Sequence, residues 1–216
     1  MSLKFLIYFL FSISSSSIYA KNESTAPKHI DLIGSIGFSF LNNFSDSLKK
    51  IQSTNGSQVR VGSEFNFSGL YTFPEIGGFI TPILGAGLHG VHSSKKINEN
   101  NFNGRYVIGW ISLEANAGLK FNIASEIKLY TLANFGFAGA TCIENIANKY
   151  SSNAKVKDHY YYGVTAITLM PLTDTVGMGG TLSINKQQMK ISYMNDSYNP
   201  ASFKQFTAGL VLIYSL

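Results

Sequence analysis

The sequence predicts an all-β protein, an eight-stranded antiparallel up-and-down transmembrane β-barrel, and three observations lead to this prediction. Charged residues make up only 13% of the 216 residues, about half of their share in ordinary soluble domains. After residue 20, no apolar run reaches the roughly 18 residues that a membrane-spanning helix needs. Apolar residues instead alternate with small or polar ones in eight segments, and this period of two is that of a β-strand.

The first twenty residues are typical of an export signal. Lys4 precedes an apolar stretch from Phe5 to Ile13, and small residues lead to a plausible cleavage site after Ala20. The apolar stretch is too short to cross about 30 Å of hydrocarbon as a helix. We therefore expect three parts: a cleaved signal peptide (1–20), a short periplasmic N-terminal segment (21–28) and an outer-membrane barrel domain (29–216).

Each expected strand has one apolar face and one face of small or polar residues. In the first strand, Ile36, Phe38 and Phe40 alternate with Gly37 and Ser39. The eight expected strands are 29–40, 58–73, 79–91, 106–121, 127–137, 159–170, 176–185 and 206–216.

The connections between these strands alternate in length. The short ones are 74–78, 122–126 and 171–175, and the long ones are 41–57, 92–105, 138–158 and 186–205. Short turns at one end and long loops at the other are the pattern of outer-membrane barrels. Both chain ends then lie at the turn end.

The large aromatic and aliphatic side chains are expected to face lipid, and the small and polar side chains to face the barrel interior. A secreted β-sandwich, the alternative, would need more charge on its solvent-facing side. Aromatic residues also gather where the interfacial girdles of a barrel would lie. Those toward the loops are Phe38, Phe40, Tyr160 and Tyr162, and those toward the turns are Tyr71, Phe73 and Phe121.

The last strand carries the most specific local pattern. Thr207, Gly209, Leu212 and Tyr214 resemble the C-terminal assembly signal of bacterial outer-membrane proteins, although the chain ends two residues later, at Leu216. Residues 81–88 (TPILGAGL) and 113–121 (LEANAGLKF), followed by a turn and 127–130 (IKLY), are similar to strands of the small barrel family that includes OmpA-, OmpX- and opacity-type proteins. The resemblance implies the barrel fold, the outer membrane with loops at the cell surface, and the barrel-assembly machinery as a partner. It does not imply one activity.

Six charged residues fall on the expected interior face. A buried charge is costly unless it is paired, so we expect either an internal ion-pair network that holds the barrel shut or individually hydrated charges. The six are Asp31, Arg60, Glu64, Glu114, Lys120 and Lys128.

The long loops carry most of the lysines. A basic rim of this kind would attract lipopolysaccharide phosphates or an anionic glycan or protein on a host surface, and ordinary solvated loops are the simpler interpretation. Only two of the 17 basic residues are Arg and the lysines are scattered, which argues against nucleic-acid binding. The loop lysines are Lys49, Lys50, Lys95, Lys96, Lys149, Lys155, Lys157, Lys186 and Lys190.

Enzymatic and channel functions are the rivals. His92 and Ser94 resemble the His-x-Ser spacing of a lipid A deacylase, in which His activates Ser and an acid orients the His. Glu99 is the nearest downstream acid, but it falls in a loop, whereas the deacylase acid lies on the neighbouring strand. A small pore is the other rival, and side chains largely fill a barrel of eight strands.

We therefore expect a non-enzymatic surface protein, structural, adhesive or antigenic, without a catalytic site, cofactor or metal. Cys142 is the single cysteine, so no intrachain disulfide or cysteine-based zinc site can form.

Overall fold

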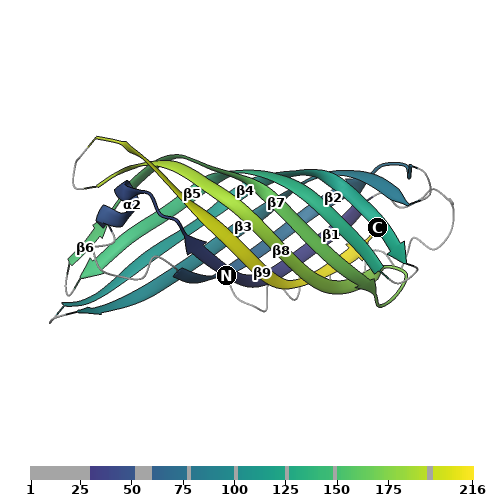
Figure 1. Ribbon diagram of the computed structural model, residues 1–216, viewed down its shortest axis with the longest axis horizontal. Coiled ribbons are helices and arrows are strands. Elements are labelled where there is room, and N and C mark those ends of the chain that lie inside the picture. The colour runs from purple at the N-terminus through teal and green to yellow at the C-terminus, as the bar shows by residue number, and fades with distance from the viewer. Residues whose placement is uncertain are drawn as a thin grey trace.

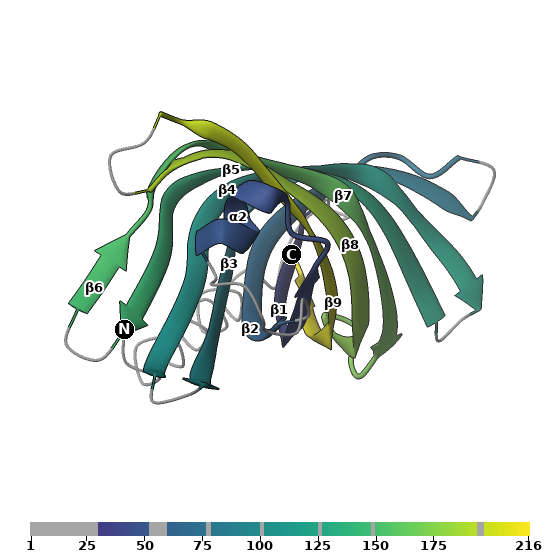
Figure 2. The same ribbon diagram turned by 60° about the vertical axis from the view of Figure 1, so that its left-hand side comes forward.

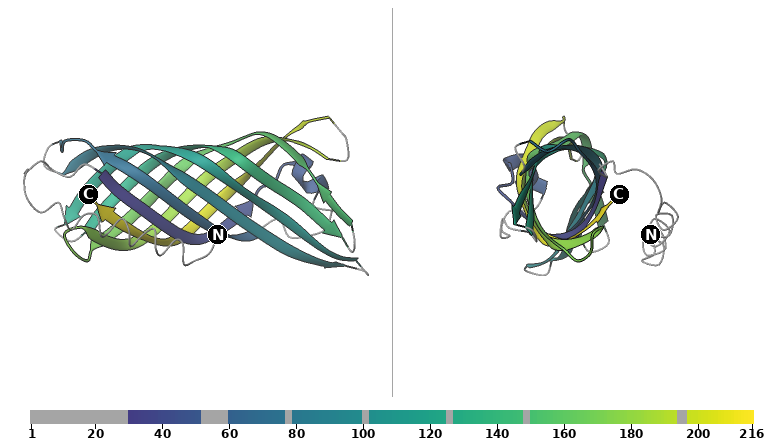
Figure 3. Two further views of the ribbon diagram at one scale, coloured as in Figure 1. Left: turned by 180° about the vertical axis from the view of Figure 1, so that it is seen from behind. Right: turned by 90° about the vertical axis from the view of Figure 1, so that its right-hand side faces the viewer.

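The computed structural model describes residues 30–51, 60–76, 79–99, 102–124, 127–147, 150–193 and 197–216. The expected signal peptide and periplasmic segment lie outside the described residues. The described strands tilt steeply against the long axis (Figure 1) and close into a ring when viewed along it (Figure 3, right). The predicted fold class is confirmed: an all-β, closed, eight-stranded antiparallel barrel.

Strand β1 pairs with β9, and this pairing closes the barrel. The order around it is β1, β2, β3, β4, β5, β7, β8, β9, and the short strand β6 pairs only with β5. The elements are β1 (Ile30–Asn42), α2 (Asp46–Ile51), β2 (Arg60–Thr72), β3 (Ile80–Glu99), β4 (Phe102–Ala124), β5 (Ile127–Ala147), β6 (Tyr150–Asn153), β7 (Lys155–Pro171), β8 (Val176–Ser192) and β9 (Asn199–Ser215).

The two faces of the wall are oriented as the alternation predicts. Leu113 and Leu210 are 70% and 67% exposed, whereas Ser112 between such outward positions is 1% exposed. Aromatic rings gather on the outer face in pairs, such as Phe40 with Phe206, whose centroids are 6.3 Å apart. In the described part of the chain, no helix is long and apolar enough to cross a membrane.

Most of the expected long loops are in fact continuations of the strands. Strands β3, β4 and β5 have 20, 23 and 21 residues, against 13 in β1 and β2. Their hairpins project beyond the rest of the barrel at the loop end (Figure 1). The prediction ended these strands too early because a strand that leaves lipid no longer needs an apolar outer face.

The described first part of the connection from β1 to β2, residues 43–51, contains a short helix. Asn43 has a φ of 53°, and the chain then turns into α2 beside β9 at the loop end (Figure 2). Ser45 N donates to the carbonyl of Ser202 at 2.9 Å. Phe44 and Leu48 become fully buried against the interior.

The described parts of the short connections lie where the prediction placed them. Both described chain ends lie at this same end, because β1 pairs with β9. Leu216 N donates to the carbonyl of Ile30 at 2.8 Å. Between β7 and β8, the Thr173 hydroxyl accepts hydrogen bonds from the N–H groups of Thr175 and Val176.

Candidate functional site

The six interior charges that the sequence singles out lie at three levels of the barrel rather than in one network. At the turn end, Lys120 Nζ lies 3.0 Å from Asp31 Oδ2. Tyr130 and Ser215 donate hydrogen bonds to the same carboxylate at 2.9 and 2.6 Å. Lys128 is half-buried near this end and has no ion pair with a described residue.

The two glutamates lie in the middle of the barrel. Ser39, Gln205 and Thr207 all donate to Glu64 Oε2, and His89 Nε2 lies 3.3 Å from Glu64 Oε1.

Glu114 is held differently, by neutral donors alone. Tyr161 Oη donates to its Oε2 at 2.6 Å and Asn66 Nδ2 to its Oε1 at 3.0 Å. Each oxygen therefore accepts one of these hydrogen bonds. Sequence reasoning placed the glutamates inside but did not identify His89 or Tyr161, although both lie on the inward parity of their strands.

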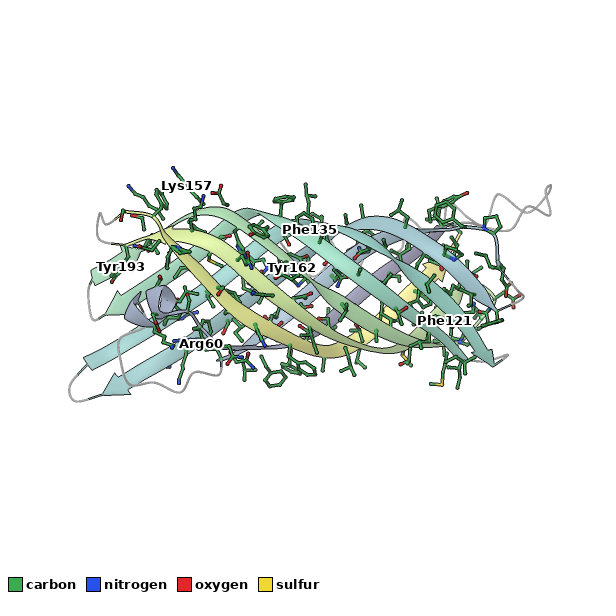
Figure 4. All side chains as sticks on the ribbon, turned by 45° about the horizontal axis from the view of Figure 1, so that its top comes forward. Arg60, Phe121, Phe135, Lys157, Tyr162 and Tyr193 are labelled. Carbon is green, nitrogen blue, oxygen red and sulfur yellow. The ribbon has the colours of Figure 1, made fainter. Side chains whose placement is uncertain are left out.

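Arg60 lies at the loop end, away from both glutamates. Its guanidinium carbon stacks 4.1 Å from the centre of the Tyr106 ring and 6.0 Å from that of Phe44. Figure 4 shows it at the opposite end of the barrel from Phe121.

Two apolar clusters close the interior above and below the polar middle, and the sequence analysis missed both. The loop-end cluster includes Trp110 and Phe203, whose rings are 5.6 Å apart. The turn-end cluster includes Leu70, Leu132 and Val211. The signal was present, because in these stretches apolar residues occupy both parities of the strand, as in Leu210 to Ile213.

The loop lysines lie on several elements rather than in free loops. Lys49 and Lys50 are on α2, where Lys49 pairs with Asp46 at 3.0 Å; Lys95 and Lys96 are on β3. Lys149 lies outside the described residues. The remaining four are on β7 and β8: Lys155, Lys157, Lys186 and Lys190.

These β7 and β8 lysines, together with Lys204 on β9, form what we call the lysine band. In the strand register, Lys157 lies directly opposite Lys190, and Lys186 directly opposite Lys204. All five are exposed. Lys204 also falls in the expected loop 186–205 but was left out of the loop lysines; on β9 it continues the outward alternation of Phe206, Ala208 and Leu210.

The lysine band begins where the apolar outer face ends. On β8, Lys186 follows the outward Ile184, and on β9 Lys204 precedes the outward Phe206. Figure 4 shows Lys157 near the loop end, with Tyr162 and Phe135 closer to the middle. In membrane barrels, the border between the apolar band and the polar rim is where the headgroups lie.

One acidic residue lies within the band. Asp158 accepts a hydrogen bond from Lys190 at 2.8 Å. This bond and the charge of Lys190 lower the pKa of Asp158 and raise that of Lys190. Lys157 is placed over the ring of Tyr198, 4.5 Å from its centre.

The His-x-Ser pattern does not form a catalytic arrangement. His92 and Ser94 both point outward from β3 and are exposed, and in the described part of the chain no hydrogen bond joins them. Arg105 Nε donates to Ser94 Oγ at 2.6 Å instead. The described residues also contain no group of three His, Cys, Asp and Glu side chains that could hold a metal.

The residues of the C-terminal signal divide between the two faces of β9. Thr207 points inward to Glu64, and Leu212 is 55% exposed on the lipid side. Tyr214 is partly exposed. Gly209 lies opposite Gly37 in the β1–β9 pairing, and a Cβ at Gly209 would come within 2.9 Å of the Gly37 Cα.

No family model and no curated protein match the sequence. Among solved structures, Neisserial surface protein A superposes with a TM-score of 0.51 at 12% identity, covering 87% of this chain and 97% of that one. The outer-membrane protease OmpT of Escherichia coli (TM-score 0.48, 11% identity, 91% and 99% covered) and Ail of Yersinia pestis (0.39, 12%, 87% and 99%) also match.

At these identities the likeness shows the fold. The chain has the fold of the small bacterial outer-membrane barrels, as the sequence resemblance implied. This fold agrees with the predicted location, the bacterial outer membrane.

Proposed function

We propose that this protein is a non-enzymatic surface barrel that binds a phosphate-bearing glycolipid through the lysine band. Lipopolysaccharide is the glycolipid that we expect it to bind. The main supporting observation is that Lys186 lies directly opposite Lys204 across neighbouring strands. Lys157 likewise lies opposite Lys190, whose charge Asp158 balances. Like charges directly opposite each other destabilise a sheet. An anion that lies between them removes this repulsion.

The position of the band favours a ligand in the same membrane. Along the strands, the lysines come directly after the apolar outer face. Their ammonium groups would therefore lie beside the barrel wall, at the level of the lipid headgroups. A Lys ammonium binds phosphate as a point charge, and a lysine near an anionic membrane surface contributes about 1 kcal/mol to binding. An adhesive or antigenic role would use the same band and the projecting hairpins against sulfated or phosphorylated host glycans.

Binding to vesicles tests the proposal. The folded barrel is titrated with vesicles that contain lipid A and with phosphatidylcholine vesicles, at low and high salt. Lys186→Gln/Lys204→Gln is expected to weaken lipid A binding about thirtyfold at low salt, and high salt is expected to reduce the difference.

The charge-matched control is Lys95→Gln/Lys96→Gln, which removes two positive charges from the β3 hairpin, outside the band. Equal losses from both double variants would show a general effect of net charge and would sink the proposed site. Binding of heparin but not of lipid A would replace glycolipid with a host glycan as the ligand.

The two rivals have less support. For a deacylase, Ser94 would have to be activated by His92, but its hydroxyl accepts a hydrogen bond from Arg105. For a pore, ions would have to pass the two apolar clusters that fill the interior. Unchanged lipid A mass spectra in cells with and without the protein would agree with a non-enzymatic role.

A further inference from the structure

A small cavity lies in the middle of the barrel, between the two apolar clusters. Its volume is about 30 Å³, and its wall includes Glu64, Glu114, Asn134, Ser183 and Asn185. A buried water needs at least about 10–15 Å³ measured in this way. The cavity therefore has room for a small ion with a water molecule.

Several buried oxygen atoms in the wall lack a hydrogen-bond partner. Within the described residues, Asn134 Oδ1, Ser183 Oγ and Asn185 Oδ1 have none, and these side chains are 6%, 6% and 3% exposed. An unpaired buried polar atom costs about 1–3 kcal/mol. Three of them on one small cavity indicate that a bound ion or water satisfies them.

The charges around the cavity indicate the sign of this ligand. Glu64 has His89 at 3.3 Å as a cationic partner when His89 is protonated. Glu114 has only the neutral donors Tyr161 and Asn66, and no Lys or Arg is among the described residues of the cavity wall. The Glu114 carboxylate is therefore without a cationic partner among the described residues, and an unpaired charge in the barrel interior is costly.

We propose that the cavity binds one monovalent inorganic cation of the sodium class. Glu114 supplies the charge, and Asn134, Ser183 and Asn185 supply neutral oxygen ligands from β5 and β8. Oxygen donors of this kind suit hard cations, and the single carboxylate of Glu114 suits a monovalent ion. The bound cation would join strands on opposite sides of the barrel and stabilise its closed form.

Refolding in different salts tests this proposal. Because apolar clusters close both ends, the full-length barrel is refolded into detergent micelles with each salt present from the start. The salts are sodium, potassium, calcium and choline chloride at equal ionic strength, and the thermal unfolding midpoint is measured. At ten times the dissociation constant, sodium is expected to raise the midpoint by roughly 3–6 °C over choline.

Glu114→Gln should lose this sodium response, and Glu75→Gln, an exposed acid at the turn end, should keep it. Equal midpoints of the wild type in sodium and choline would overturn the proposal, and a larger rise in calcium would overturn the monovalent assignment. If Glu114→Gln does not fold, crystals of the wild type grown in sodium chloride decide the question. A peak in the cavity whose oxygen contacts are shorter than hydrogen bonds supports sodium, and contacts of hydrogen-bond length, as around a water molecule, refute it.

Discussion

The buried ion pair at the turn end offers a quantitative test of how the interior is held together. Lys120 Nζ lies 3.0 Å from Asp31 Oδ2, and the two side chains are 14% and 4% exposed. At an effective dielectric constant of about 20, two unit charges at this distance attract each other by about 5 kcal/mol. Desolvation of both groups offsets much of this attraction. We expect a net coupling free energy of about 2–3 kcal/mol between the two residues.

The two single variants should differ in cost because the partners differ in their surroundings. Lys120→Met leaves the Asp31 charge buried with only the Tyr130 and Ser215 hydroxyls, and we expect it to lower the free energy of unfolding by about 3 kcal/mol. Asp31→Asn leaves Lys120, whose long stem can carry its ammonium group to water at the turn end. Its cost should therefore be smaller, about 1–2 kcal/mol.

The assay is a double-mutant cycle by reversible urea unfolding of the barrel in lipid vesicles, followed by tryptophan fluorescence. Lys128→Met is the matched control, because Lys128 lies near the same end without an ion pair to a described residue. Its effect should stay within about 0.5 kcal/mol. A coupling below about 0.5 kcal/mol between Asp31 and Lys120, or an equal loss from the control, would refute the assigned role of the pair.

Three further results are expected. Gly209→Ala should destabilise the barrel, because the added methyl group would meet the β1 backbone. Gly34→Ala, which has open space around its Cβ, should be neutral or slightly stabilising. The midpoints of urea unfolding compare the two variants, and equal midpoints would contradict the close approach of Gly209 to β1. The fluorescence of Trp110, which is buried inside the barrel, should resist quenching by brominated lipid, whereas that of Leu113→Trp in a Trp110→Phe background should be strongly quenched. The reverse order would mean that the inward and outward faces of the strand are exchanged. Partial burial is the main cause that raises the pKa of the Cys142 thiol. Because thiolate is the reactive form, a membrane-impermeant maleimide should label Cys142 on whole cells slowly at neutral pH and faster as the pH rises. A labelling rate that does not change with pH would refute this.

The fold could be predicted because lipid imposes a simple rule on each strand. Outward positions in the membrane are mostly apolar, so the alternation in segments such as 111–120 can be read directly from the residues. The rule applies only within the membrane. Above it, residues such as Lys186 and Lys190 still alternate around inward Gln187 and Met189, but their outer face is polar and the sequence then resembles a loop.

The interior was harder to predict because its rule depends on partners across the barrel. The sequence placed Glu64 and Glu114 inside, but no local signal links Glu114 on β4 to Tyr161 on β7, 47 positions away. The pairing of Asp31 with Lys120 spans 89 positions. Only the closure of the sheet brings such residues together, so the sequence alone could list the interior charges but could not pair them.

The low charge content, 13% of the chain, follows from how few places in this barrel tolerate a charge. The lipid-facing wall excludes charges, and the interior accepts them only with a partner, as Asp31 has in Lys120. The expected internal ion-pair network is not needed to close the barrel, because Trp110 and Phe203 above and Leu70 below already fill the interior. The polar middle is then free for another role. Glu114, which has no cationic partner among the described residues, is the position where that role should be sought.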